Sequence, residues 1–283
     1  MQSFLYMLAP LEDTSDSALR TLCYRYGADT TFTEMTRLDS LARNNKSTWD
    51  KISILDDTPA WVQVVGSKEN MLKKFLDEYE PPKSFQGINF NLGCPSPPMV
   101  SLGLGCAMIK RITKIKNMVK IVADYGYACS LKLRLGLNQY EKEKKTYLHL
   151  IEGTNASFFI VHARHGKQHY ESPADMSVYD ECVKTGKKII ANGDIHTVEQ
   201  VQSLKNVGVH GIMIGRNAVY NPAIFNTLKG LPVPNIEALR EEYLALANGF
   251  QAKLHYAKNV LKRLGKTEDT DSTKNELDTQ SQG

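Results

Sequence analysis

The sequence predicts an α/β fold of the TIM (β/α)8 barrel type, followed by a short C-terminal helical module and a disordered tail. Short β-rich runs alternate with helix-length segments along most of the chain, which is the pattern of a parallel sheet covered by helices. Eight such β/α units fit within about 230 of the 283 residues, a length compatible with one barrel. Polar residues follow many of the runs, as they do where barrel loops carry chemistry.

The expected strands are short runs rich in apolar and β-branched residues. The fourth shows the pattern clearly, because residues 87–91 alternate apolar and polar side chains before Gly93 and Pro95 end the strand. The segments between strands have the length of helices. In chain order, strands are expected at residues 4–9, 30–34, 60–65, 87–91, 130–134, 158–162, 188–192 and 211–214, and helices at 15–26, 68–79, 109–125, 141–152, 174–185, 198–206 and 218–228.

The chain is expected to divide into three parts. Residues 1–230 form the barrel with its catalytic loops. Residues 235–265 combine apolar positions such as Leu239 and Tyr243 with basic ones, which indicates one or two helices outside the barrel. Residues 266–283 are mostly polar, with a single leucine, so they cannot bury enough apolar surface and are expected to be disordered.

Composition argues against several classes of protein. With 42% hydrophobic and 23% charged residues, the chain resembles ordinary globular proteins, and no segment approaches the roughly 18 uncharged apolar residues of a membrane span. Residues 1–10 lack a basic region and a cleavage site, so we expect a cytoplasmic protein without a secretory signal. Basic groups outnumber acidic ones by four, which is compatible with a polyanionic partner, although solvated lysine faces give the same count.

The five cysteines are scattered singly, without a C-x-x-C pair. This odd set argues against a disulfide framework and against a zinc site, and we expect no bound metal. Most of the thiols are expected to fill core space. Cys94 differs, because it follows a buried strand and sits between Gly93 and Pro95, where a flat ligand can approach closely.

Polar residues gather at the predicted carboxyl ends of the strands, where a barrel places its reactive groups. One inward Lys or Gln could be a satisfied structural group, but their joint occurrence predicts a site. The residues are Pro10, Leu11 and Glu12 after the first strand, Gln63 on the third, Asn91 and Cys94 at the fourth, Lys132 and Arg134 on the fifth, His162 and Arg164 at the sixth, Asn192, Gly193 and Asp194 at the seventh, and Gly215 and Arg216 after the eighth.

Two of these loops predict a phosphate site. Residues 192–194 and 215–217 follow the seventh and eighth strands, where barrels often bind phosphate. Their glycines free backbone N–H groups to point at phosphate oxygens, and Arg216 adds a forked cation. Neither a G-x-G-x-x-G nor a P-loop pattern occurs, so a Rossmann dinucleotide site and a P-loop are not supported.

Lys132 and Cys94 indicate a type of reaction. A cation at Lys132 could lie against the pyrimidine edge of a flavin and stabilise the negative charge that builds there on reduction, although a salt bridge inside the barrel would also explain it. The thiol of a free cysteine is mostly protonated at neutral pH, so Cys94 can act as a general acid. A general acid beside a hydride donor reduces a polarised double bond.

Seven motifs occur in one order between residues 4 and 229: Ala9-Pro10, Thr33-Glu34-Met35, Asn91-Leu92-Gly93-Cys94-Pro95, Lys132-Leu133-Arg134-Leu135-Gly136, Val161-His162-Ala163-Arg164, Asn192-Gly193-Asp194-Ile195 and Met213-Ile214-Gly215-Arg216. Together they resemble the signature of the tRNA-dihydrouridine synthases. The resemblance implies an FMN-dependent oxidoreductase that uses NADPH, or alternatively NADH, to reduce the C5–C6 double bond of particular uridines in tRNA. It also implies that a hydride passes from flavin N5 to C6 while Cys94 protonates C5.

The resemblance assigns roles to individual residues. It implies FMN contacts at Pro10, Leu11, Glu12, Gln63, Lys132, His162, Asn192, Gly193, Asp194, Gly215 and Arg216, and it places Asn91 and Arg164 nearer the substrate uracil. His162 could instead be a packed core histidine. Three features depart from the family pattern: Leu11 stands where a methionine is usual, His165 where a threonine is usual, and the helical region after the barrel is shorter than is common. The last two put substrate choice and tRNA binding in question.

Three functions are therefore weighed. The first is a tRNA-dihydrouridine synthase with an FMN-binding barrel and a helical module like a tRNA-binding domain, acting on tRNA as a monomer, without a membrane partner. The second is an FMN-dependent reductase or dehydrogenase of a free pyrimidine or other small enone, which turnover without RNA would favour. The third is a non-catalytic RNA-binding barrel, against which the presence of Cys94 and Lys132 speaks.

Overall fold

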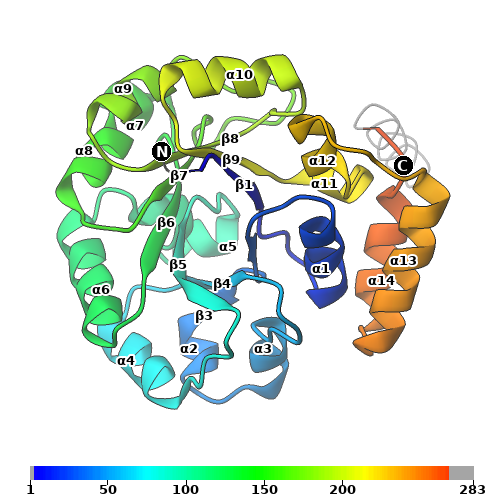
Figure 1. Ribbon diagram of the computed structural model, residues 1–283. Helices are drawn as coiled ribbons and strands as arrows, with labels where there is room; N and C mark the ends of the chain where they lie inside the picture. The colour runs from blue at the N-terminus through cyan, green and yellow to red at the C-terminus, as the bar shows by residue number, and fades with distance from the viewer. Residues whose placement is uncertain (1–2, 268–283) are drawn as a thin grey trace, which may run out of the picture.

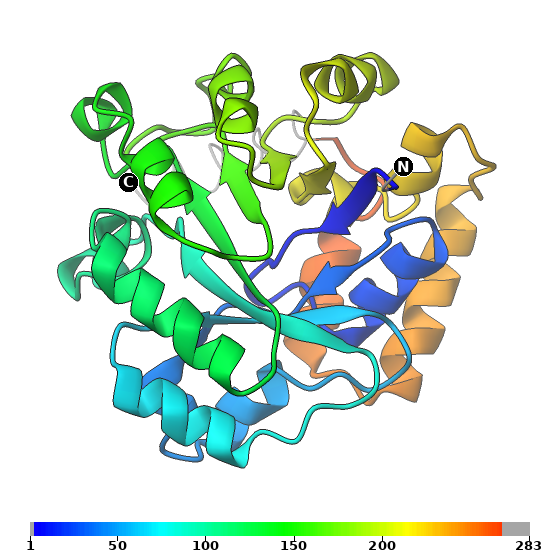
Figure 2. The ribbon, with the colours of Figure 1, turned by 60° about the vertical axis from the view of Figure 1, so that its left-hand side comes forward.

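The computed structural model describes residues 3–267 and confirms the predicted barrel (Figure 1). Parallel strands form an inner ring, and helices cover its outside, as Figure 2 shows from a second direction. The strands pair in the order β1-β9-β8-β7-β6-β5-β4-β2, and β3 also pairs with β4. Their bounds are β1 Leu5–Leu8, β2 Thr31–Phe32, β3 Thr36–Arg37, β4 Ala60–Val65, β5 Phe85–Leu92, β6 Cys129–Arg134, β7 Phe159–His162, β8 Ile189–Asn192 and β9 Gly211–Ile214.

A single bridge brings the two edges of the barrel together. Met7 on β1 pairs in parallel with Thr30, just ahead of β2. The backbone N–H of Leu8 donates to the carbonyl of Thr30 at 3.1 Å. All strands run in the same direction, so the loops at their carboxyl ends surround one mouth.

The predicted second strand, residues 30–34, is interrupted in the structure. Phe32 pairs with Trp61 on β4, whereas Thr36 pairs with Val64, so β2 and β3 use one residue more than β4 over the same length. Such an extra residue is a β-bulge, which redirects side chains and is common beside functional sites. Glu34 lies in this bulge.

The helices follow the predicted alternation with some differences. Residues 141–152 were expected as one helix but divide at Lys145, which has a positive φ of 53°. Residues 218–228 also divide, because Pro222 lacks the N–H that would continue the helix. The pattern missed α2 Leu38–Leu41, α3 Lys46–Lys51, α5 Pro97–Ser101 and the 3-10 turn Gly105–Met108, all too short to show helical periodicity. The remaining helices around the barrel are α1 Ser17–Arg25, α4 Glu69–Glu78, α6 Ile112–Asp124, α7 Gln139–Glu143, α8 Thr146–Gly153, α9 Val178–Lys184, α10 Val198–Val207, α11 Arg216–Tyr220 and α12 Ile224–Lys229.

The barrel interior is apolar except for one polar layer. Large side chains such as Phe32, Trp61 and Ile160 pack against one another in a cluster separate from the core between strands and helices. Within the interior, the amide of Gln63 donates to Asn89 at 2.7 Å, and the amide of Asn89 donates to Ser130 at 2.8 Å. The buried amides therefore satisfy one another, as a low-dielectric interior requires.

Two further helices, α13 Ile236–Gly249 and α14 Leu254–Arg263, occupy the region predicted as a helical module. They stand together beside the barrel, with α13 packed on α1 and α14 packed on α11 (Figure 1). Of the tail expected to be disordered, residues 268–283 lie outside the described residues. Within the described part of the chain, no helix combines the length and the apolar character needed to cross a membrane.

Candidate active site

The loops after β1, β7, β8 and β9 surround a cleft at the mouth of the barrel. It brings together most of the residues predicted from the sequence. Those that line it are Pro10, Leu11, Lys132, His162, Arg164, Asn192, Gly193, Asp194, Gly215 and Arg216, joined by Ala9, Tyr170, Ile195, Met213, Ile214 and Asn217. Five predicted site residues, Glu12, Gln63, Asn91, Cys94 and Arg134, are not among the lining residues.

Lys132 brings a cation to the inner end of the cleft. Burial, and next the charge of Arg134, lower the pKa of Lys132 to about 8. Among residues 3–267, Lys132 has no hydrogen-bond or ion-pair partner. Lys132 is half-buried. A partly desolvated cation without a protein partner costs stability, which a ligand with electron-rich or negative atoms would offset.

His162 lies beside the same charges and is held neutral. Burial lowers the pKa of His162 well below its usual value, and the positive charges of Lys132, Arg134 and Arg164 add to the effect. Nη1 of Arg164 lies 3.3 Å from Nε2 of His162. Since a guanidinium only donates, Nε2 must accept, and the proton of the neutral ring then sits on Nδ1.

Arg164 and Asp194 form a two-pronged ion pair beneath the loop that follows β7. The guanidinium donates to the two carboxylate oxygens of Asp194 at 2.8 and 2.5 Å, and to the carbonyls of Tyr170 and Ser172 at 3.0 and 2.9 Å. Only 1% of Arg164 is exposed. Burial opposes ionisation of Asp194, but hydrogen bonds from Arg164 and from the backbone N–H of Ala174 outweigh it and lower the pKa of Asp194. A contact between Arg164 and substrate therefore stays a prediction.

The loop carrying Asp194 requires a glycine at position 193. Gly193 has a φ of 116°, and a Cβ there would lie 2.9 Å from Cδ2 of His162. Asp194 itself adopts a positive φ of 51°, which its hydrogen bonds to Arg164 and Ala174 stabilise. The side chain of Asn192 donates to the carbonyl of Met213 at 2.9 Å and so ties β8 to β9.

Tyr170 is a cleft residue that the sequence pattern did not single out. Its ring lies beneath the guanidinium of Arg216 at 3.9 Å and stacks on His162 with the ring centroids 6.1 Å apart. The loop that carries Tyr170 is anchored to β6, because Arg134 donates to the carbonyl of His165 at 2.9 Å. The only available signal was the long irregular segment after the sixth predicted strand, which is typical of a functional loop.

Cys94 sits on a loop fixed by Asn91. The side-chain oxygen of Asn91 accepts the backbone N–H groups of Gly93 and Cys94 at 3.1 and 2.8 Å, while its NH2 donates to Gln63 at 2.9 Å. Both ends of the Asn91 amide are therefore used inside the protein, as is the amide of Gln63. The thiol of Cys94 is partly exposed and lies 3.4 Å from the hydroxyl of Ser96. The geometry gives Asn91 the role of holding Cys94 in place, and the ligand contacts predicted for Asn91 and Gln63 stay predictions.

Chemically, the cleft offers an apolar wall and several cations. Ala9, Leu11 and Met213 supply the wall, and Lys132 and Arg216 supply positive charge at different places in it. Such a site suits an elongated ligand with a flat ring and a phosphate. Among residues 3–267, no group of three or more His, Cys, Asp or Glu side chains is arranged to hold a metal ion.

Comparison with known proteins gives a consistent result. The family described as Dihydrouridine synthase (Dus) matches residues 7–278. A probable tRNA-dihydrouridine synthase of Helicobacter pylori (strain ATCC 700392 / 26695) is 29% identical over 230 residues, which cover 77% of this chain and 68% of that protein. The tRNA-dihydrouridine synthase B of Pseudomonas putida is 27% identical over 274 residues, 92% of this chain and 81% of that protein.

A human relative is similar over a smaller share of its own length. It is named tRNA-dihydrouridine(47) synthase NAD(P)(+)-like and is 27% identical over 226 residues, which cover 78% of this chain and 35% of that protein. This chain therefore spans about a third of the human relative and most of the two bacterial ones.

Proposed function

Because the chain belongs to the dihydrouridine synthase family, we propose that it is a flavin-dependent oxidoreductase that reduces the C5–C6 double bond of uridines in tRNA. The proposal rests on how β5 and β6 pair in the sheet. Asn91 on β5, which holds the Cys94 loop, pairs directly with Lys132 on β6, the half-buried cation of the cleft. The loop that carries the proposed proton donor, Cys94, is thus anchored beside the strand that carries the cation of Lys132.

The residues of the cleft fit FMN as the cofactor. Leu11 and Met213 offer apolar surface for the flat ring, and Lys132 would face the ring atoms that become negative on reduction. Arg216, with the glycine-containing loops of residues 193 and 215, would hold the phosphate. The unpartnered ammonium of Lys132 is the feature that a flavin would satisfy best.

Different side chains of the protein then have different roles in the reduction of uridine. When bound, reduced flavin supplies the hydride that C6 of uracil accepts, and NADPH or NADH replenishes it. Cys94 gives the proton from its thiol to C5, so one hydride and one proton together saturate the double bond. The resulting thiolate takes a proton back from water, for which the partly exposed position of Cys94 leaves a path. Asn91 keeps the loop of Cys94 in a fixed position throughout.

Basic helix surfaces on the barrel suit the phosphates of tRNA. Lys114, Lys116 and Lys120 lie on α6 and are exposed. Contacts of this kind are blind to sequence and would position the RNA while one uridine leaves its stack to enter the barrel mouth.

The test is dihydrouridine formation in a tRNA transcript that has no modified bases, after incubation with the purified protein, FMN and NADPH. The wild type is compared with Cys94→Ala and with Cys129→Ala, which removes a buried thiol on β6. We expect Cys94→Ala to keep its flavin and to lose at least about 100-fold in rate, because a general acid contributes at least that factor. Cys129→Ala should stay near the wild-type rate.

Two results would contradict the proposal. A protein that binds FMN and oxidises NADPH with free uracil or another small enone, but leaves tRNA unchanged, would favour a small-molecule reductase. A protein that binds tRNA and no flavin would favour a non-catalytic RNA-binding barrel.

A further inference from the structure

Glu34 is a buried carboxylate in the bulge between β2 and β3, outside the lining of the cleft. Only 1% of it is exposed. One carboxylate oxygen, Oε2, accepts the backbone N–H of Asp13 at 2.6 Å and lies 3.4 Å from Nζ of Lys51. The other, Oε1, accepts the hydroxyl of Tyr256, a buried residue on α14. Glu34 thus joins the loop after β1 to the C-terminal helix.

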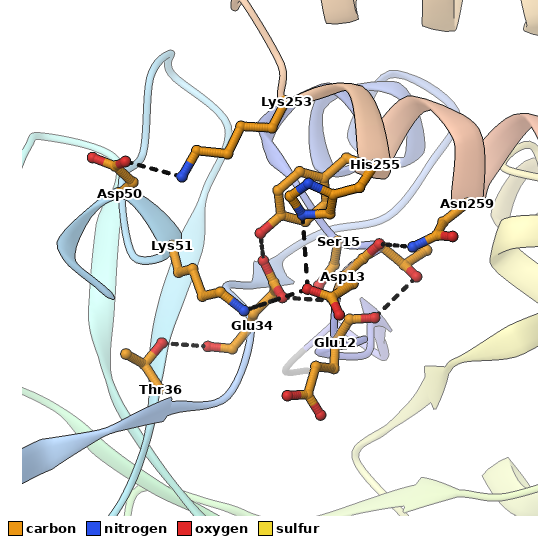
Figure 3. Close-up of polar contacts among 12 residues, drawn as sticks. Glu12, Asp13, Ser15, Glu34, Thr36, Asp50, Lys51, Lys253, His255 and Asn259 are labelled. Atoms are coloured by element: carbon orange, nitrogen blue, oxygen red, sulfur yellow. Dashed lines mark hydrogen bonds and ion pairs between the residues drawn. The ribbon is translucent and has the colours of Figure 1, made fainter. Parts of the chain in front are cut away.

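A second set of contacts from α14 reaches the same loop. Nδ2 of Asn259 donates to the carbonyl of Asp13 at 2.8 Å, and Nε2 of His255 lies 3.8 Å from the Asp13 carboxylate. Figure 3 shows Glu34, Lys51, His255 and Asn259 converging on Asp13 from three separate segments of the chain. We call Asp13, Glu34, Lys51, Tyr256 and Asn259 the Glu34 clamp.

The backbone held by the clamp is in a conformation that needs support. Asp13 has a positive φ of 51°, which is unfavourable for a residue other than glycine. Such a conformation persists only where its surroundings fix it. Here the backbone N–H of Asp13 donates to Glu34, and its carbonyl accepts from Asn259. Both polar backbone groups of Asp13 are therefore hydrogen-bonded to residues that lie outside the cleft.

The same loop forms one wall of the cleft. Pro10 and Leu11 line it, and the loop closes on itself where the backbone N–H of Leu11 donates to the hydroxyl of Ser15 at 2.9 Å. Asp13 lies between these two anchor points. A change in its backbone therefore moves the apolar surface at Leu11.

We propose that Glu34 and Tyr256 are positioning residues that transmit the position of helix α14 to the loop after β1, and so set the shape of the cleft wall at Leu11. Neither residue touches the cleft. The consequence for flavin rests on the proposed function, whereas the coupling between α14 and the loop does not. If RNA moves α14, linkage requires that RNA and flavin change each other's affinity by the same factor.

The decisive experiment compares Tyr256→Phe with Tyr243→Phe. Each change removes one buried tyrosine hydroxyl from the C-terminal helices, but the hydroxyl of Tyr243 has no hydrogen-bond partner in the described part of the chain. Amide hydrogen exchange of residues 10–16 is measured on both variants without flavin. We expect Tyr256→Phe to speed exchange at Asp13 about tenfold, the effect of losing one hydrogen bond to a charged group, while Tyr243→Phe leaves it unchanged.

Flavin affinity is measured on the same proteins by titrating the apoprotein with FMN. We expect Tyr256→Phe to weaken FMN binding about three- to tenfold and Tyr243→Phe to leave it at the wild-type value. A merely structural role for Tyr256 would lower the melting temperature of Tyr256→Phe and leave its FMN affinity unchanged. Should Tyr256→Phe fail to fold, Asn259→Ala removes the other contact from α14 to Asp13 and should speed exchange there in the same way.

The outcomes separate this inference from the proposed function. Unchanged exchange of residues 10–16 in both Tyr256→Phe and Asn259→Ala overturns the clamp. Faster exchange in a protein whose wild type binds no FMN supports the clamp and removes the flavin function. Faster exchange with unchanged FMN affinity shows that the loop is held by α14 but does not shape the cleft, which also overturns the inference.

Discussion

The cleft and the Glu34 clamp handle buried charge in opposite ways. In the cleft, Lys132 is a half-buried cation without a partner among residues 3–267. In the clamp, Glu34 is a buried anion whose two oxygens are met by a backbone N–H, an ammonium and a hydroxyl. Since a buried charge is costly unless paired, only the cleft is incomplete without a further molecule.

The difference teaches how to separate binding groups from structural groups in one molecule. Arg164 lines the cleft, but its guanidinium donates hydrogen bonds to Asp194 and to two carbonyls of its own loop. By the criterion of internal pairing, Arg164 resembles Glu34 more than it resembles Lys132. Position in a cleft alone therefore does not identify a ligand-binding residue, and the following variants test the criterion.

The largest effect is expected for Lys132→Met. If the ammonium stabilises charge on the reacting group, its loss should lower the rate of uridine reduction about 10²- to 10³-fold. The same change should stabilise the flavin-free protein at pH 7 by about 1 to 3 kcal/mol, because it removes a half-buried unpaired cation whose pKa is lowered to about 8. Steady-state kinetics and urea unfolding measure the two effects.

The pH dependence of that stability difference has a definite sign. The folded-state pKa of Lys132 lies below its unfolded value of about 10.4, so the cost is fully present below pH 8. It disappears as the pH rises from about 8 to about 10.4, where the wild type and Lys132→Met should converge. Lys74→Met, at an exposed position on α4, serves as the control and should change neither property. A less stable flavin-free Lys132→Met protein would show that Lys132 is a structural group after all.

Arg164→Met should give the next largest effect, on stability rather than on chemistry. The change removes the two-pronged donor of Asp194, which keeps the N–H of Ala174, and it leaves two loop carbonyls without their donor. Breaking a buried ion pair from one side costs about 3 kcal/mol. Urea unfolding of the flavin-free protein measures this loss. A flavin-free Arg164→Met protein as stable as the wild type, with weaker substrate binding, would instead assign Arg164 to the substrate.

Asp16→Asn tests the same criterion beside the clamp. Asp16 caps α1, since its Oδ1 accepts the N–H of Leu19 at 2.9 Å, but its buried Oδ2 has no partner within residues 3–267. Burial raises the pKa of Asp16 to about 6. An asparagine keeps the cap without the charge, so we expect about 1 kcal/mol of added stability at pH 7.

The sign of its pH dependence is opposite to that of Lys132. The folded-state pKa of Asp16 lies above the unfolded value of about 3.9, so its contribution is present below pH 4 and is lost as the pH rises through 6. Melting curves of Asp16→Asn and the wild type should therefore coincide near pH 4 and separate by pH 7. An advantage of equal size at both pH values would mean that the charge of Asp16 is not the cause.

The sequence predicted the barrel and most of the cleft because both depend on local signals. Strand ends are marked by short apolar runs, and the closure of the barrel brings those ends together, so Lys132, His162 and Gly193 meet without any pair being specified. The short helices α2 and α3 were missed, since they contain too few residues to display a 3.6-residue period.

The clamp could not be predicted in the same way. Glu34 belongs to a motif noted in the sequence, but its partner Tyr256 lies 222 residues further along the chain. No periodicity links two single residues at that separation, and the bulge that directs Glu34 depends on one extra residue relative to β4. The hydrogen bond between the side chains of Asn91 and Gln63 could not be predicted for a related reason. A side chain's hydrogen-bond partners depend on strand register.

Lys253→Ala should have the smallest effect and completes the comparison. Lys253 pairs with Asp50 at 3.0 Å and, like the clamp, links the C-terminal helices to the barrel, but the side chains of the pair are 47% and 46% exposed. Water and salt screen such a pair, so we expect a loss of no more than about 0.5 kcal/mol in unfolding free energy. Exchange of residues 10–16 should match the wild type. Faster exchange there in Lys253→Ala would mean that docking of α14 as a whole, rather than the contact between Tyr256 and Glu34, holds the loop after β1.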